Sequence, residues 1–228
     1  MADLPALAEN LINGEAEEAE ELTRKMLNEG VPPDEIFAKG FIRGMDFVRE
    51  KFRNGELYIP KVFLAAKAMH AGMDILRPAL ASSGVKPIGK VALGTVKGDF
   101  HDIDKNLSAV MLEGAGFEVL DLGVDVPPEK FVRAAKDGAD IIAMSAFLIT
   151  AIVSMKTTLE ALEEARLRDE VKTMIVGAPV SQDYADLIGA DGYAQSAPSA
   201  VDKAKQLMEL AFLGSPKAAA TSARNSDS

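Results

Sequence analysis

Residues 90–126, KVALGTVKGDFHDIDKNLSAVMLEGAGFEVLDLGVDV, place a helical pattern between two short apolar runs. The runs at 91–96 and 118–122 are rich in Val and Leu, as buried strands are. Between them, residues 107–115 carry apolar side chains at helical spacing, and Gly116 follows. A strand, a helix and a second strand in this order form a unit with parallel strands. The stretch therefore predicts an α/β fold.

The same alternation continues to residue 213. Further strands are predicted at 140–144, 173–176 and 192–194, and further helices at 127–136, 149–167, 181–188 and 197–213. Five apolar strands, each followed by a helix, predict a Rossmann-like (flavodoxin-like) five-stranded parallel sheet with helices on both faces. The tail at 214–228 is small and polar, and we expect it to be disordered.

Residues 1–81 have a helical pattern throughout. Four segments, at 4–11, 15–28, 33–52 and 60–80, show apolar residues three and four positions apart. Short Gly-, Asn- and Pro-containing breaks separate them, so they predict an N-terminal four-helix bundle. Residues 82–90 are small, polar and interrupted by Gly and Pro. We interpret them as a linker to a sheet domain at 91–213.

The composition excludes several classes of protein. A net charge of −10 leaves too little positive charge to neutralise nucleic-acid phosphates. The absence of cysteine excludes disulfides, Cys-ligated zinc and iron–sulfur clusters. No apolar run approaches the roughly 20 residues that cross a bilayer, and residues 1–10 lack the pattern of a signal peptide. We therefore expect a cytoplasmic protein without nucleic-acid or membrane partners.

Candidate functional residues follow the first, third and fourth strands. In an open parallel sheet, ligands bind at the carboxyl ends of the strands, near the point where the strand order reverses. The flavodoxin-like order places the first and third strands at that point. The segments 97–104, 145–150 and 177–180 leave the three strands there. We expect them to converge on one rim of the sheet.

His101 is one of two histidines and lies in the first of these segments. Neutral imidazole is a good transition-metal ligand, and a metal-bound histidine usually donates its other N–H to a carboxylate, for which Asp99 is the candidate. With no cysteine and no second histidine nearby, the residues favour a metal that brings its own equatorial ligands. A histidine in a solvated turn is the alternative that these residues alone leave open.

Three motifs then reveal a resemblance. Residues 99–104 (DFHDID), 145–147 (SAF) and 176–177 (VG) resemble the D-x-H-x-x-G, S-x-L and G-G fingerprint of cobalamin-binding domains, with similar spacing. Residues 55–60 and 189–194 also look like this family. Over residues 1 to about 213, the chain is most similar to corrinoid proteins of methylotrophic methyltransferase systems, which serve methanol, methylamines, betaines or methoxy-aromatics.

The resemblance implies how the cofactor is held. The benzimidazole base of cobalamin leaves the cobalt, His101 becomes the lower axial ligand, and Asp99 holds its other N–H. Ser145 contacts the buried nucleotide tail, while Gly177 and Ala178 leave room for it. A helix-capping role for Ser145 and a turn role for Gly177 are the alternatives. The remaining cofactor contacts implied by the resemblance are Gly98, Asp102, Ile103, Asp104, Phe147, Thr150 and Tyr193.

Several positions depart from the family pattern. Asp104 and Val176 stand where the fingerprint has glycine, and Phe147 stands where it has leucine. Ala151 lies near the expected position of a hydroxyl residue that continues the Asp–His chain, and Thr150 is the candidate substitute. These differences bear on affinity and on the corrinoid that is bound, and leave the class unchanged.

The implied function is that of a non-catalytic corrinoid subunit of a cobalamin-dependent methyltransferase system. Its cobalamin alternates between methylcobalamin and Co(I) corrinoid. The implied partners are a substrate:corrinoid methyltransferase, a methylcorrinoid:acceptor methyltransferase and a reductive activase. The alternatives are a cobalamin-dependent sensor or regulator, although the chain has no basic helix-turn-helix, a cofactor-storage module, and a cofactor-free interaction module.

Overall fold

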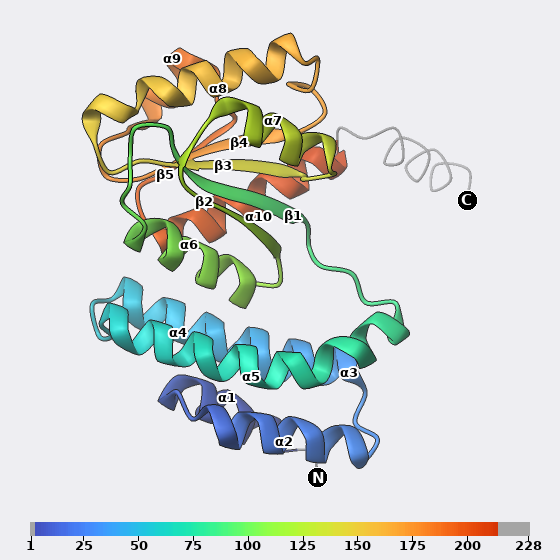
Figure 1. Cartoon of the computed structure of the whole chain (residues 1–228). Coiled ribbons are helices and arrows are strands. Elements are labelled where there is room, and N and C mark those ends of the chain that lie inside the picture. The colour runs from blue at the N-terminus through green and yellow to red at the C-terminus, as the bar shows by residue number, and fades with distance from the viewer. Residues whose placement is uncertain (1–2, 214–228) are drawn as a thin grey trace, which may run out of the picture. The chain divides into compact units, whose positions relative to one another are not determined.

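A computed structural model describes residues 3–213, and the tail for which we predicted disorder lies outside them. The chain divides into two compact units, which we call the helical unit and the sheet unit (Figure 1). The helical unit comprises residues 3–87 and 106–117, and the sheet unit comprises residues 88–105 and 118–213. Helix α6 (Ile103–Gly114) is divided between the two. None of the helices in the described range is long and apolar enough to cross a membrane.

The helical unit confirms the predicted N-terminal bundle. Its elements are α1 (Leu4–Asn13), α2 (Ala16–Asn28), α3 (Pro33–Glu35), the π-helical η1 (Ile36–Ile42), α4 (Arg43–Arg53) and α5 (Ile59–Ser83). The third predicted helix is thus built from three consecutive helical segments, and α5 ends at Ser83, inside the predicted linker. Leu7, Leu11, Phe41 and Leu76 are fully buried between these helices, as the spacing of apolar residues predicts.

The sheet unit has the predicted five parallel strands. They are β1 (Lys90–Val96), β2 (Glu118–Val126), β3 (Ile141–Ser145), β4 (Lys172–Val176) and β5 (Gly192–Ala194). The order β2-β1-β3-β4-β5 confirms the flavodoxin-like topology. The strand order therefore reverses between β1 and β3, which follow each other across the sheet but not along the chain.

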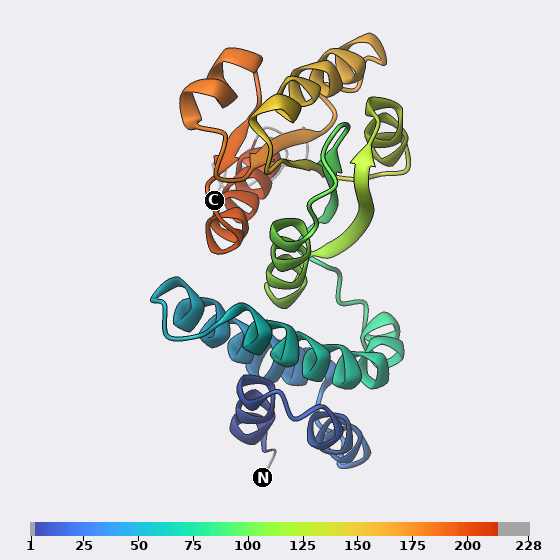
Figure 2. The ribbon, with the colours of Figure 1, turned by 60° about the vertical axis from the view of Figure 1, so that its left-hand side comes forward.

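Helices cover both faces of the sheet. They are α7 (Pro128–Lys136), the 3-10 turn η2 (Ile149–Ala151), α8 (Val153–Glu164), α9 (Gln182–Ile188) and α10 (Ala197–Leu213). Helices α7 and α8 lie on one face and α10 on the other (Figures 1 and 2). Strand residues such as Ala92, Ile142 and Ile175 are fully buried with Phe131 of α7. Burial on both faces explains why the strands are almost uninterrupted apolar runs.

Asp191, directly before β5, anchors the edge of the sheet opposite the carboxyl ends. Its Oδ2 accepts hydrogen bonds from the backbone N and the Oγ1 of Thr173, each at 2.8 Å. The Nη1 of Arg168 lies 2.8 Å from the same oxygen. Burial raises the pKa of Asp191, but the hydrogen bonds from Arg168 and Thr173 outweigh burial and hold the pKa below its ordinary value of 3.8.

We expect Asp191→Asn to lower the free energy of unfolding by about 2 kcal/mol near neutral pH. A depressed pKa stabilises the folded protein above the unfolded value, and this contribution is lost as the pH falls through the folded value. The difference between variant and wild type should therefore shrink below pH 3.8. Urea unfolding checks this, with tyrosine fluorescence recorded in a Tyr58→Phe background that retains only Tyr184 and Tyr193 of the sheet unit.

The matched control is Asp186→Asn, which changes an exposed carboxylate on α9. Its hydrogen bond to Gln182 lies on the surface, so little stability should be lost at any pH. A difference between Asp191→Asn and wild type that stayed constant down to acid pH would contradict the assigned role of the Asp191 carboxylate.

Candidate functional site

The carboxyl ends of four strands form one row across the sheet. Thr95 of β1 pairs with Ser145 of β3, Ser145 pairs with Val176 of β4, and Val176 pairs with Ala194 of β5. The segments that follow β1, β3 and β4 therefore leave the sheet side by side. This confirms the expected convergence of the three segments on one rim.

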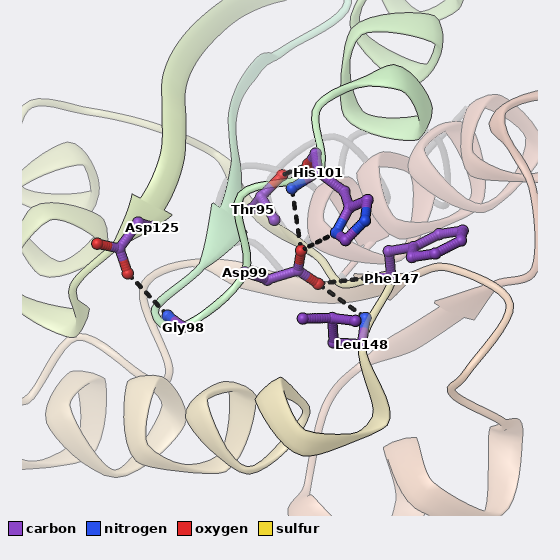
Figure 3. A network of polar contacts seen from close by, with 7 residues as sticks. All are labelled: Thr95, Gly98, Asp99, His101, Asp125, Phe147 and Leu148. Carbon is purple, nitrogen blue, oxygen red and sulfur yellow. Dashed lines mark hydrogen bonds and ion pairs between the residues drawn. The ribbon is translucent and has the colours of Figure 1, made fainter.

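A buried carboxylate joins two of these segments (Figure 3). Asp99 has no exposed surface. Its Oδ1 accepts hydrogen bonds from the backbone N of His101 at 3.0 Å and from the Nδ1 of the same residue at 2.7 Å. Its Oδ2 accepts from the backbone N of Phe147 at 2.7 Å and of Leu148 at 2.8 Å. Asp99 therefore holds Nδ1 of the His101 imidazole. It also joins the segment that follows β1 (97–104, the β1 segment) to the segment that follows β3 (145–150, the β3 segment).

The charge state of Asp99 determines which nitrogen of His101 is free. Burial raises the pKa of Asp99, but the hydrogen bonds from the backbone and from the imidazole outweigh burial, so the pKa lies below its ordinary value of 3.8. An ionised carboxylate only accepts hydrogen bonds, so Nδ1 of His101 is the donor. In the neutral imidazole, Nε2 then keeps its lone pair. This arrangement therefore leaves Nε2 of His101 able to bind a metal.

Two residues that the sequence reasoning missed hold the β1 segment in place. The Oγ1 of Thr95 donates to the carbonyl of His101 at 2.8 Å. The Oδ1 of Asp125 accepts from the backbone N of Gly98 at 2.7 Å, and the backbone N of Asp125 donates to the carbonyl of Asp99 at 2.9 Å. The available signal was the position of Asp125 at the carboxyl end of β2, the strand beside β1.

Exposed apolar residues are frequent in the segments that carry His101 and Phe147. The His101 side chain is 50% exposed, and the Phe147 ring lies against it with centroids 4.4 Å apart and planes inclined by 32°. The large exposed apolar residues of the two segments and of the helix start that follows are Phe100, Ile103, Phe147, Leu148, Ile149 and Val153. Several large exposed apolar residues in the segments of one rim are typical of a ligand-binding surface.

The positions that depart from the family fingerprint cause no backbone strain. Asp104 is exposed in the first turn of α6 and does not have a positive φ. Val176 is a buried strand residue. Gly177 has a φ of 137°, and a Cβ there would lie 2.2 Å from the carbonyl oxygen of Ala146. Glycine is therefore required at 177 by the backbone, whether or not a cofactor tail passes beside it.

The remaining predicted contacts fall in different environments. Ser145 is buried at the end of β3, and Tyr193 packs against the sheet core. Asp102, Thr150 and Ala178 are exposed on the rim. Thr150 does not continue the Asp–His chain, because the four hydrogen bonds to Asp99 come from His101 and two backbone N–H groups. The backbone N–H groups of the β3 segment supply the hydrogen bonds to Asp99 that we expected from a hydroxyl.

The donor set fits a metal that carries most of its own ligands. Within residues 3–213, no three His, Cys, Asp or Glu side chains come close enough to hold a metal ion. One imidazole whose Nε2 makes no hydrogen bond within these residues is available instead, with the Phe147 ring against it and further exposed apolar residues in the same rim segments. Such a site suits a large planar cofactor that has apolar faces and takes one axial ligand from the protein. The flavodoxin-like sheet and the single imidazole at its rim therefore place the chain among proteins that bind a metal-containing cofactor.

Comparison with known proteins identifies that cofactor. Models of B12 binding domains match residues 4–77 and 89–202. The trimethylamine corrinoid protein of Methanosarcina barkeri is 46% identical over 195 residues, which are 84% of this chain and 90% of that protein. This chain therefore belongs to the B12-binding corrinoid proteins, and it binds cobalamin.

Solved structures agree with this family. A cobalamin-binding protein from Desulfitobacterium hafniense DCB-2 superposes with a TM-score of 0.73 at 33% identity, covering 91% of this chain and 99% of that one. A chain of the methanol:cobalamin methyltransferase complex from Methanosarcina barkeri gives a TM-score of 0.75 at 24% identity, covering 89% of this chain and 78% of that one. The second likeness shows the fold alone.

Proposed function

We propose that Nε2 of His101 is the lower axial ligand of the cobalt in bound cobalamin, and that the chain carries a methyl group on that cobalt between partner methyltransferases. The observation that carries the proposal is the state of His101. Its Nδ1 is held 2.7 Å from a buried carboxylate, the ring is half exposed, and Nε2 makes no hydrogen bond within the described residues.

The residues around the site each have a task in this function. Asp99 fixes the tautomer of His101 and raises the basicity of the imidazole. The negative charge of the Asp99 carboxylate would also favour positive charge on the His101 ring. The exposed apolar residues of the rim would exclude water from a bound cofactor. Cobalamin supplies the cobalt–carbon chemistry, in which the metal accepts a methyl group and gives it up.

The names of the relatives guide the choice of methyl donor. They include trimethylamine and dimethylamine corrinoid proteins. We infer that a methylamine is the methyl donor to test first and that a substrate:corrinoid methyltransferase loads the chain. A methylcorrinoid:acceptor methyltransferase and a reductive activase complete the expected partners. A cytoplasmic location stays a prediction from the sequence.

An absorbance titration with cobalamin tests the ligand. Wild type should give the spectrum of histidine-ligated cobalamin, whereas His101→Ala should lose that spectrum and bind at least about tenfold more weakly. The control is His70→Ala, because His70 of the helical unit is the other histidine of the chain and pairs with Glu113. It should behave like wild type. Identical spectra for His101→Ala and wild type would remove the ligand assignment.

A further inference from the structure

We propose that Phe147 is a positioning residue for His101, whose ring holds the imidazole plane in the orientation that Nε2 needs to meet the cobalt. The proposal rests on the proposed function and deepens it. Its basis is the ring contact, with centroids 4.4 Å apart and planes inclined by 32°. The backbone N of the same residue donates to Oδ2 of Asp99 at 2.7 Å. One residue therefore secures both the carboxylate and the imidazole (Figure 3).

Asp99 alone limits the tilt of the imidazole plane only loosely. Rotation about χ2 moves Nδ1, so the hydrogen bond at Nδ1 opposes it, but a hydrogen bond tolerates a range of angles and the χ2 minima are broad. Half of the His101 side chain is exposed, and Nε2 has no hydrogen-bond partner within residues 3–213. Contact with the face of the Phe147 ring supplies the missing second constraint. Nδ1 and the ring face together define the direction of the Nε2 lone pair.

The arrangement is specific to the aromatic side chain at position 147. Leucine, which the family fingerprint has here, lacks a flat face that can lie along an imidazole. The Phe147 side chain is 53% exposed, so filling the core does not explain its presence. Phe100 is a natural comparison, because it is 70% exposed beside His101 in the chain and its ring makes no contact with the imidazole.

A double-mutant cycle with aquacobinamide tests the proposal. This corrinoid lacks the nucleotide and its base, so only the protein or water can supply the ligand below the cobalt. In the wild-type background, Phe147→Leu should weaken binding by about fivefold, the range of an aromatic pair, and reduce the histidine-ligated spectrum. In a His101→Ala background, the same substitution should have no effect on affinity, because Phe147 acts through the imidazole. Phe147→Tyr keeps the ring and should behave like wild type.

The outcomes separate this proposal from the ligand assignment. If His101→Ala binds aquacobinamide as tightly as wild type, the ligand assignment fails. If His101→Ala weakens binding but Phe147→Leu has the same effect in both backgrounds, Phe147 only contacts the corrin and the positioning role is overturned. Phe100→Leu is the control and should show no such dependence on His101. Phe147→Met, measured in the same cycle, decides the question if the leucine variant does not fold.

Discussion

Gly177→Ala is expected to lower the free energy of unfolding of the sheet unit by about 4 kcal/mol. The φ of 137° at Gly177 is rarely adopted by residues with a side chain, and the new Cβ would lie 2.2 Å from the carbonyl oxygen of Ala146. That oxygen belongs to the backbone and cannot turn away. The backbone N of Ala146 donates to the carbonyl of Val176 at 3.2 Å, and the N of Gly177 donates to that of Ala194 at 3.0 Å.

Gly138→Ala separates the two causes. Gly138 also has a positive φ, 87°, but nothing lies within 4 Å of a Cβ built there. Its replacement should cost only the conformational term, about 1 kcal/mol. Urea unfolding in the Tyr58→Phe background measures both variants. Equal losses at the two positions would show that the approach of Ala146 to Gly177 does not matter.

Most of the fold could be predicted because its strands are continuous apolar runs. The runs at 91–96 and 140–144 lie within one residue of the observed β1 and β3. Strand β2 was predicted to end at 122, but it continues to Val126. Gly123 and Asp125 interrupt the apolar pattern of the extension, and the extension pairs with β1 only after register shifts at Gly94. A pattern of buried side chains cannot detect such a strand end.

The site was predicted in part for a similar physical reason. The contact between Asp99 and His101 joins side chains two residues apart, and their residue types and spacing indicate it. The other partners of Asp99 are backbone N–H groups of Phe147 and Leu148, which any residues could supply. Hydrogen bonds of this kind leave no mark on residue type. Residue types also did not reveal the 3-10 turn η2 (Ile149–Ala151), which the sequence predicted as the start of the helix at 149–167.

Asp99→Asn should destabilise the sheet unit by about 3 kcal/mol and reduce ligation of cobalamin by His101. Each oxygen of Asp99 accepts two hydrogen bonds, and the carboxylate is fully buried. An amide has one oxygen, so its NH2 group must face either the donors of His101 or the N–H groups of Phe147 and Leu148. In both orientations two N–H donors lose their acceptor, unless the imidazole changes its tautomer. Urea unfolding and the cobalamin spectrum measure the two effects.

The amide can relieve part of this conflict only at the expense of the ligand. If its NH2 group faces His101, the imidazole can shift its proton to Nε2 and accept at Nδ1, which leaves Nε2 without a lone pair for cobalt. The control is Asp125→Asn in the same network. There a single oxygen accepts from Gly98 at 2.7 Å, and asparagine also tolerates the φ of 51°. This variant should lose less than about 1 kcal/mol and keep the histidine-ligated spectrum. Normal ligation in Asp99→Asn would mean that the carboxylate does not set the tautomer of His101.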